Sequence, residues 1–306
     1  MKKLLISLVL LFSSSVMFAQ GDLHLFKVDN KDGLITPSTI EKAFIDNGFK
    51  IAVNSEMNVP FKKQFQKTNF KVFTLLTVYH NELSQDLVKK YPDAGVFTPL
   101  GVGIYQGINE DVLHVSALTS QAQSKILGFD DKLLKDIEKE VIKSIQSALV
   151  NPKHRFSEDS LKENRGLISK FELKLEGEDF EEIKEELEMN LENGFDPFGF
   201  VMPNYLDFND LMTQEGTIES PFDFYVTYSI CKLKVIYTVS QTRPEAAAFA
   251  PCTLMVYKKK DEDKIVLGFP AVYNWMSSAL VENKDAKRVL QKAQNDFESI
   301  LLDITE

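Results

Sequence analysis

Cys231 and Cys252 are the side chains of this chain with the clearest capacity for chemistry, and they are its only cysteines. Each falls in a segment that predicts a strand, and the two strands are expected to be neighbours in one sheet. Thiols within reach of each other form a disulfide in an oxidising compartment, whereas separated thiols behave as small buried side chains. The sequence favours inert thiols and leaves open a structural disulfide or a redox, metal or cofactor role. The Cys-x-x-Cys spacing of thioredoxin-like redox sites is absent, which weakens the redox hypothesis.

Sequence patterns for catalysis are missing. The chain lacks the Gly-x-Ser-x-Gly, His-Glu-x-x-His and glycine-rich phosphate-loop motifs. Its four histidines lie far apart and form no paired ligand motif, so each is expected to be exposed or satisfied within the fold: His24, His80, His114 and His154. We therefore expect a protein that is not an enzyme, with no catalytic residues, no metal site and no identifiable cofactor.

The aromatic side chains of the second half favour binding. Several tyrosines and the single tryptophan, Trp275, surround its expected sheet, where most of them should be core. A sheet wrapped on a long helix can leave an apolar cavity at its open end, and Arg243 beside Trp275 would supply a polar group there. The candidate binding residues are therefore Cys231, Cys252, Arg243 and Trp275. The expected occupant is a small apolar or amphipathic ligand, or a periplasmic protein partner.

The first residues indicate export. Lys2 and Lys3 precede a short apolar run at residues 4–11, and Ala19 is a plausible last residue of a cleaved signal peptide. We expect a periplasmic or secreted protein, with an uncleaved anchor as the alternative, and no later membrane span. The net charge of −10 disfavours nucleic-acid binding, which needs clustered lysine and arginine side chains.

A repeat organises the rest of the chain. A shift of 152 positions places residues 70–149 over residues 222–301 without a gap, and it aligns Pro99 with Pro251. A long period with one copy in each half indicates two similar domains in tandem. We expect a signal peptide at residues 1–19, a first domain at 20–150, a linker at 151–168 and a second domain at 169–306, packed as a pseudo-dimer within one chain.

Both copies predict an antiparallel sheet with helices on one face, which is an α+β fold. In the first copy we expect strands at 23–28, 49–53, 70–79, 97–105 and 112–117, and helices from Thr36 to a stop at Asn47-Gly48, at 83–90 and at 131–149. Gly101 and Gly103 fall inside one of these strands, where a bulge or close packing explains them. The second copy opens with a strand at 171–175 and a helix at 179–193. A long aromatic loop at 195–220 follows, where a function specific to this copy could lie.

Two segments carry a family resemblance. The run from Tyr91 to Tyr105, and more closely the run from Pro244 to Tyr257, resemble the signature of domain of unknown function family 302. In that family an acidic or small-residue turn leads to Leu-Pro-Cys and an apolar strand ending near Tyr, and a further Cys often lies in the preceding strand. Cys252 and Cys231 match those cysteines in the second copy, whereas Leu100 and Tyr79 stand there in the first.

The resemblance implies two tandem copies of a strand-helix-four-strand-helix fold of the kind shared with TATA-binding-protein-like domains, and it carries no activity. Any thiol function that it implies is confined to the second copy.

Three functions follow from the sequence. The favoured one is an exported, non-catalytic binding protein. The alternatives are a thiol-based redox or cofactor- or metal-binding protein that uses Cys231 and Cys252, and a structural or assembly protein.

Overall fold

The computed structural model describes residues 21–158, 160–161, 167–214 and 219–306. The predicted signal peptide at residues 1–19 lies outside the described residues. None of the helices in the described part combines the length and apolar character that crossing a bilayer requires.

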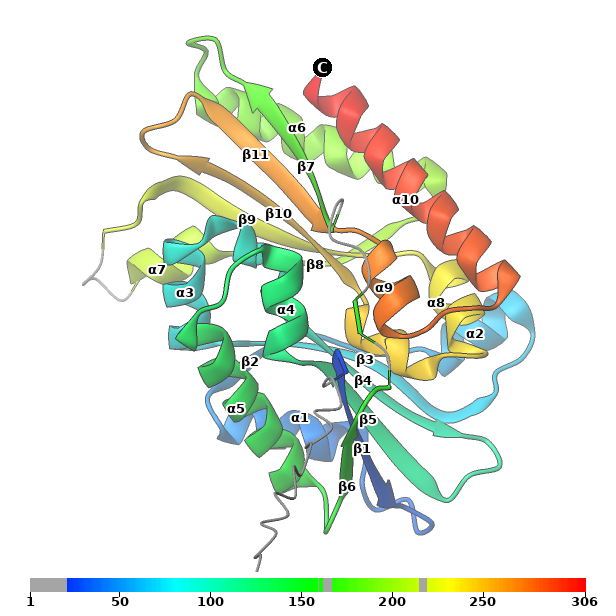
Figure 1. Ribbon diagram of the computed structural model, residues 1–306. Coiled ribbons are helices and arrows are strands. Elements are labelled where there is room, and N and C mark those ends of the chain that lie inside the picture. The colour runs from blue at the N-terminus through cyan, green and yellow to red at the C-terminus, as the bar shows by residue number, and fades with distance from the viewer. Residues whose placement is uncertain (1–20, 159, 162–166, 215–218) are drawn as a thin grey trace, which may run out of the picture.

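The first repeat forms a six-stranded antiparallel sheet with its long helices on one face (Figure 1). In spatial order the strands are β2 (Phe49–Glu56), β3 (Phe70–His80), β4 (Leu100–Gly107), β5 (Val112–Leu118), β1 (Leu23–Asp29) and β6 (Lys153–Phe156). The helices are α1 (Pro37–Asp46), α2 (Asn58–Phe65), α3 (Asn81–Lys90), the 3-10 helix η1 (Pro92–Phe97), α4 (Ser120–Leu127) and α5 (Lys132–Ala148). Helices α1 and α5 contact each other over the sheet.

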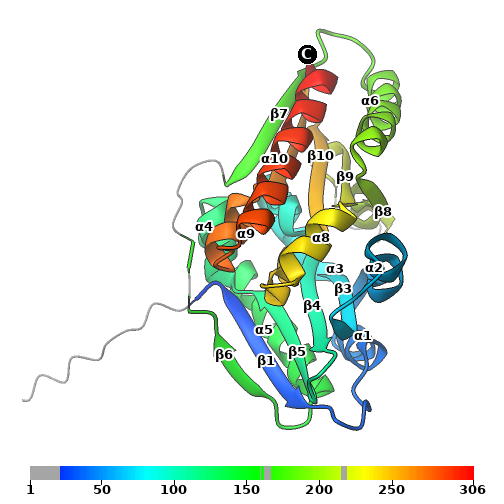
Figure 2. The same cartoon turned by 90° about the vertical axis from the view of Figure 1, so that its right-hand side faces the viewer.

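The second repeat forms a five-stranded antiparallel sheet of the same topology. In the corresponding spatial order its strands are β8 (Val201–Asp207), β9 (Phe222–Cys231), β10 (Cys252–Lys259), β11 (Lys264–Pro270) and β7 (Ile168–Lys174). Its helices are α6 (Phe180–Phe195), the 3-10 helix η2 (Asp196–Phe198), α7 (Phe208–Gln214), α8 (Leu233–Ser240), the 3-10 helix η3 (Pro244–Phe249), α9 (Tyr273–Ser278) and α10 (Lys284–Thr305). Figure 2 shows α10 lying along this sheet.

The agreement between the repeats confirms the predicted α+β class and the tandem duplication. Sheet orders β2-β3-β4-β5-β1 and β8-β9-β10-β11-β7 are the same order of equivalent strands. The peptide bonds before Pro99 and Pro251 are both cis. Strand β6 has no equivalent in the second sheet; it lies within the segment expected as a linker and pairs with β1.

Local sequence signals explain most of the long elements. The Thr36 side chain accepts a hydrogen bond from the Thr39 backbone N–H, and Pro37 opens α1 behind it. Asp131 and Asp179 cap α5 and α6 in the same way. The apolar side chains that recur at helical spacing along α5 are the ones that are buried: Leu134, Ile137, Val141 and Ile145.

The stretch at residues 195–220, expected as a loop, contains strand β8 and helix α7 instead. Helix α6 also runs past the predicted stop at Asn193-Gly194. A Cβ atom on Gly194 would lie 2.9 Å from Cγ2 of Ile300, so this glycine allows α10 to approach closely rather than ending the helix.

The two repeats are joined by a reciprocal contact, in which the 3-10 helix of each repeat packs on the sheet of the other. Helix η3 contacts β4 and β5, and η1 contacts the equivalent strands β10 and β11. A Cβ atom on Gly101 would lie 2.5 Å from the Ala248 carbonyl oxygen, and one on Gly103 would lie 2.6 Å from Cβ of Ala247. Close packing, one of the two alternatives that the sequence left open, is therefore the reason for both strand glycines.

The contact of η1 with β10 uses the equivalent positions, but here the smaller residue is on the 3-10 helix and the larger one is on the strand. Gly95, the counterpart of Ala247, lies against Met255, the counterpart of Gly103: a Cβ atom on Gly95 would be 3.1 Å from Cβ of Met255. The Tyr225 hydroxyl donates a 2.5 Å hydrogen bond to the Pro92 carbonyl oxygen. Small residues on one side thus receive larger residues on the other in both halves.

Replacement of Gly103 by alanine tests this contact. We expect Gly103→Ala to lower the free energy of unfolding by about 1–3 kcal/mol, because the new methyl group overpacks the interface. Adding Ala247→Gly should recover part of that loss, since it removes the atom that the methyl group meets. Urea denaturation of both single variants and the double variant gives the coupling. Strictly additive effects would contradict the contact.

Candidate functional site

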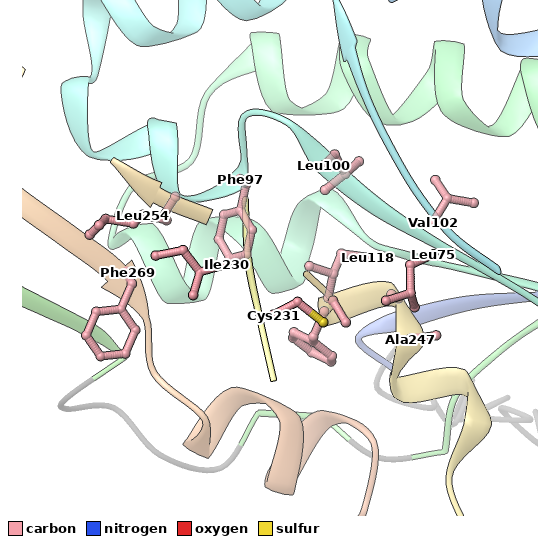
Figure 3. Close-up of a cluster of buried hydrophobic side chains, with 14 of the residues drawn as sticks. Leu75, Phe97, Leu100, Val102, Leu118, Ile230, Cys231, Ala247, Leu254 and Phe269 are labelled. Carbon is pink, nitrogen blue, oxygen red and sulfur yellow. The ribbon is translucent and has the colours of Figure 1, made fainter. Parts of the chain in front are cut away.

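A pocket of about 290 Å³ lies between the two repeats. Its lining is mostly apolar and comes from both halves of the chain. The first repeat supplies Val53, Met57, Pro60 and Leu75, and the second supplies Val201, Pro203, Cys231, Leu233 and Pro251. Figure 3 shows Cys231 near the interface, with Leu75 of the first repeat close to it. The volume and the mostly apolar lining are compatible with a small apolar molecule.

Several residues that line the pocket differ from their counterparts in the other repeat, and two of these differences place an aromatic ring at the position related by symmetry. Tyr79 is the counterpart of Cys231, and Phe208, the first residue after β8, is the counterpart of Met57, the first residue after β2. The rings of Tyr79 and Phe208 meet edge to face with their centroids 5.5 Å apart, and Phe208 is fully buried. The rings of Tyr79 and Phe208 therefore fill the position that pseudo-symmetry relates to the pocket. The pocket itself is lined by the Cys231 thiol and the flexible Met57 thioether instead.

The lining of the pocket also includes two polar residues. Ser55 and Glu56 line it beside the apolar residues. The Glu56 carboxylate accepts hydrogen bonds of 2.8 and 3.0 Å from the backbone N–H groups of Asn58 and Val59, so it is fixed at the N-terminus of α2. An occupant with an apolar body and a hydrogen-bond donor at one end would match this arrangement.

The two cysteines are free thiols, which excludes the disulfide alternative for this structure. Cys252 pairs with Ile230 across the sheet, and Cys231 is the next residue along β9. The two cysteines therefore lie on neighbouring strands, as the sequence predicted, and both line one small cavity. Burial raises the pKa of each thiol to about 12, with a smaller contribution to Cys252 from Cys231. Both thiols are therefore protonated and poor nucleophiles at neutral pH.

Arg243 does not line the cavity that Trp275 lines. Trp275 is buried, stacks on Phe249 and lines a cavity of only about 30 Å³ that Cys231 and Cys252 also line. That volume holds a water molecule at most. The Arg243 guanidinium instead lies 3.4 Å from the Glu245 carboxylate, beside η3. Of the four candidate residues, Cys231 alone reaches the pocket between the repeats.

Two histidines that the sequence leaves unrelated lie in contact. Nδ1 of His24 is 3.0 Å from Nε2 of His154, and Nε2 of His24 is 2.8 Å from the Glu138 carboxylate, which also accepts hydrogen bonds from Ser120. His154 lies on β6, the strand that the sequence did not predict, so no local pattern could have revealed the pair. Among the described residues, no group of three His, Cys, Asp or Glu side chains is placed to hold a metal ion.

Comparisons with known proteins agree with the resemblance seen in the sequence. Residues 171–304 match the family model "Domain of unknown function DUF302". The chain is also similar to a solved structure, the uncharacterized conserved protein DUF302 from Bacillus stearothermophilus, with 16% sequence identity and a TM-score of 0.35, over 46% of this chain and 99% of that one. No curated protein matches the chain. The match confirms the family for the second repeat; for the first repeat, membership stays a prediction.

The raised pKa values predict how the thiols respond to pH. At pH 8 we expect Ellman's reagent to label both cysteines only when the protein is unfolded, because roughly one thiol in ten thousand is ionised in the folded chain. Unfolded thiols ionise near pH 8.5, so the free energy of unfolding should fall as the pH rises from about 8.5 towards 12. A Cys252→Ser variant assigns the signals. Rapid labelling of either thiol in the folded protein would contradict the burial.

Proposed function

The second half of the chain, residues 171–304, belongs to the DUF302 family, whose function is unknown, and we propose from the pocket that the protein is an exported, non-catalytic binding protein. It holds a small, largely apolar molecule between its two repeats. The observation that carries this proposal is the apolar pocket of about 290 Å³ at the point where the repeats differ.

Two observations favour a binding site over a packing defect as the explanation of the pocket. Close-packed interiors leave few voids larger than a water molecule, and the rest of this interface is packed so tightly that glycines are needed. Val201 at the pocket is 55% exposed, so an occupant has a route from solvent. The Glu56 carboxylate in the lining favours an amphipathic occupant whose polar end donates a hydrogen bond.

Export is proposed from the start of the sequence, where Lys2 and Lys3 precede an apolar run, and the contacts of Asp22 are compatible with cleavage after Ala19. Asp22, three residues after the predicted cleavage at Ala19, is already buried, and its carboxylate accepts a 2.6 Å hydrogen bond from the Ser278 hydroxyl of the second repeat. Its carboxylate also lies 3.1 Å from the Lys125 ammonium group. Removal of residues 1–19 would therefore leave every one of these contacts in place.

The other hypotheses have less support. A thiol redox function needs an accessible thiolate, and burial keeps both thiols protonated. A structural or assembly role fits the interlocked repeats, but it gives no reason for an open apolar pocket between them.

Native mass spectrometry of the protein taken from its own cells tests the proposal. We expect a chain that begins at Gln20 together with a bound small molecule whose mass is lost on denaturation. An empty mature chain that also fails to take up apolar probes would contradict the binding function.

A variant that fills the pocket gives the matched test. We expect Cys231→Phe to reduce binding of the fluorescent apolar probe N-phenyl-1-naphthylamine at least tenfold, because a ring would enter the pocket as Tyr79 and Phe208 do on the other side. Cys231→Ser keeps the size of the side chain and serves as the control, with binding expected to change little. Equal binding by the wild type and Cys231→Phe, with both folded by circular dichroism, would place the probe elsewhere and contradict the site.

A further inference from the structure

One residue separates the pocket between the repeats from a smaller cavity inside the second repeat. This smaller cavity is the one of about 30 Å³ that Trp275 lines, and its walls come mainly from β9, β11, α8, α9 and α10. We call it the inner cavity. Among the residues that the structure describes, Cys231 alone lines both the pocket and the inner cavity.

The residues next to Cys231 show that the two spaces are adjacent. On three segments, one residue lines the inner cavity and the next residue of the chain lines the pocket: Phe200 and Val201, Lys232 and Leu233, and Cys252 and Pro251. In Figure 3 Cys231 lies between Phe269, which lines the inner cavity, and Leu75, which lines the pocket. The Cys231 side chain is therefore the partition between the two spaces.

The exposure of the lining residues gives the pocket an open side and a closed side. Glu56, Val201 and Pro203 are exposed, whereas Leu75 and Cys231 are buried. The Glu56 carboxylate accepts two backbone hydrogen bonds and keeps lone pairs for a further donor. An amphipathic occupant therefore places its polar end near Glu56 and its apolar end towards Cys231.

The apolar part of the lining is aliphatic. It consists of valine, leucine, methionine and proline side chains together with Cys231, and no aromatic ring is among the described residues that line the pocket. Such walls bind apolar surface without requiring a ring to stack on them. A linear alkyl chain fits this lining.

We propose that Cys231 sets the length of the occupant, a linear alkyl chain whose hydrogen-bond-donating head lies at Glu56 and whose tail ends against the Cys231 side chain. This inference rests on the binding function proposed above. The tail stops at Cys231 because this side chain closes the way to the inner cavity, and a smaller side chain would let the tail pass.

Displacement of N-phenyl-1-naphthylamine by the linear primary alcohols from 1-butanol to 1-dodecanol tests the proposal. Alcohols are uncharged, so the net charge of −10 does not attract or repel them. For the intact wild-type chain we expect the affinity to rise about fourfold with each added methylene group. The rise should stop at the alcohol whose tail reaches Cys231.

Cys231→Ala removes the sulfur and opens the partition. We expect it to extend the rise by about two carbon atoms, one in place of the sulfur and one in the inner cavity, which has the size of one water molecule. The first alcohol beyond the wild-type limit should then bind about fourfold more tightly to Cys231→Ala than to the wild type. Cys231→Val, which is larger, should shift the limit to a shorter alcohol.

Cys252→Ala is the matched control. Cys252 lines the inner cavity but not the pocket, so its truncation enlarges only the space behind the partition and should keep the wild-type limit. A terminally brominated alcohol gives a second readout, because bromine quenches tryptophan fluorescence on contact and Trp275, the single tryptophan, lines the inner cavity. We expect quenching in Cys231→Ala and none in the wild type.

The outcomes separate this inference from the binding function. With the variants folded by circular dichroism, the length rule alone is overturned if Cys231→Ala and Cys231→Val keep the wild-type limit, if Cys252→Ala shifts it as far as Cys231→Ala, or if the wild-type affinity rises through the whole series. If neither the naphthylamine nor any alcohol binds the wild type, the binding function fails and the length rule fails with it.

Discussion

The fold depends on one contact made twice, the insertion of each repeat's 3-10 helix onto the sheet of the other. Each sheet has one face under its own long helices, and the other face would be left exposed without its neighbour. Helices η1 and η3 cover those faces. Only glycine fits where the two repeats approach most closely, at Gly95, Gly101 and Gly103. The arrangement is that of an isologous dimer whose two subunits are joined in one chain.

Because the two repeats are joined in one chain, their sequences can diverge. The candidate site lies where the two sequences differ. In a true dimer a cavity at one end of the interface would be repeated at the other. Here Tyr79 and Phe208 close one end, whereas Cys231 and Met57 leave the other open. The second repeat supplies part of the pocket lining, and it is also the half that matches the family model.

The sequence predicted the architecture well because strong local signals mark the long elements. The cap at Thr36, the starts of helices near Asp131 and Asp179, and the helical spacing of apolar residues on α5 were visible without coordinates. Helices η1 and η3 and strand β6 were not visible, because their stability comes from contacts far away in the chain. The pocket was missed for the same reason: its walls come from both repeats, and only Cys231 among the predicted residues reaches it.

The central claim, that the repeats form one interlocked unit, is tested most directly by equilibrium unfolding observed with two probes. Trp275, the single tryptophan, reports on the second repeat alone, whereas far-ultraviolet circular dichroism reports on both. The account predicts coincident transitions with one midpoint, because each sheet loses the cover of its second face without the other repeat. A tryptophan transition clearly separated from the circular dichroism transition would show that the repeats fold independently and would contradict the account.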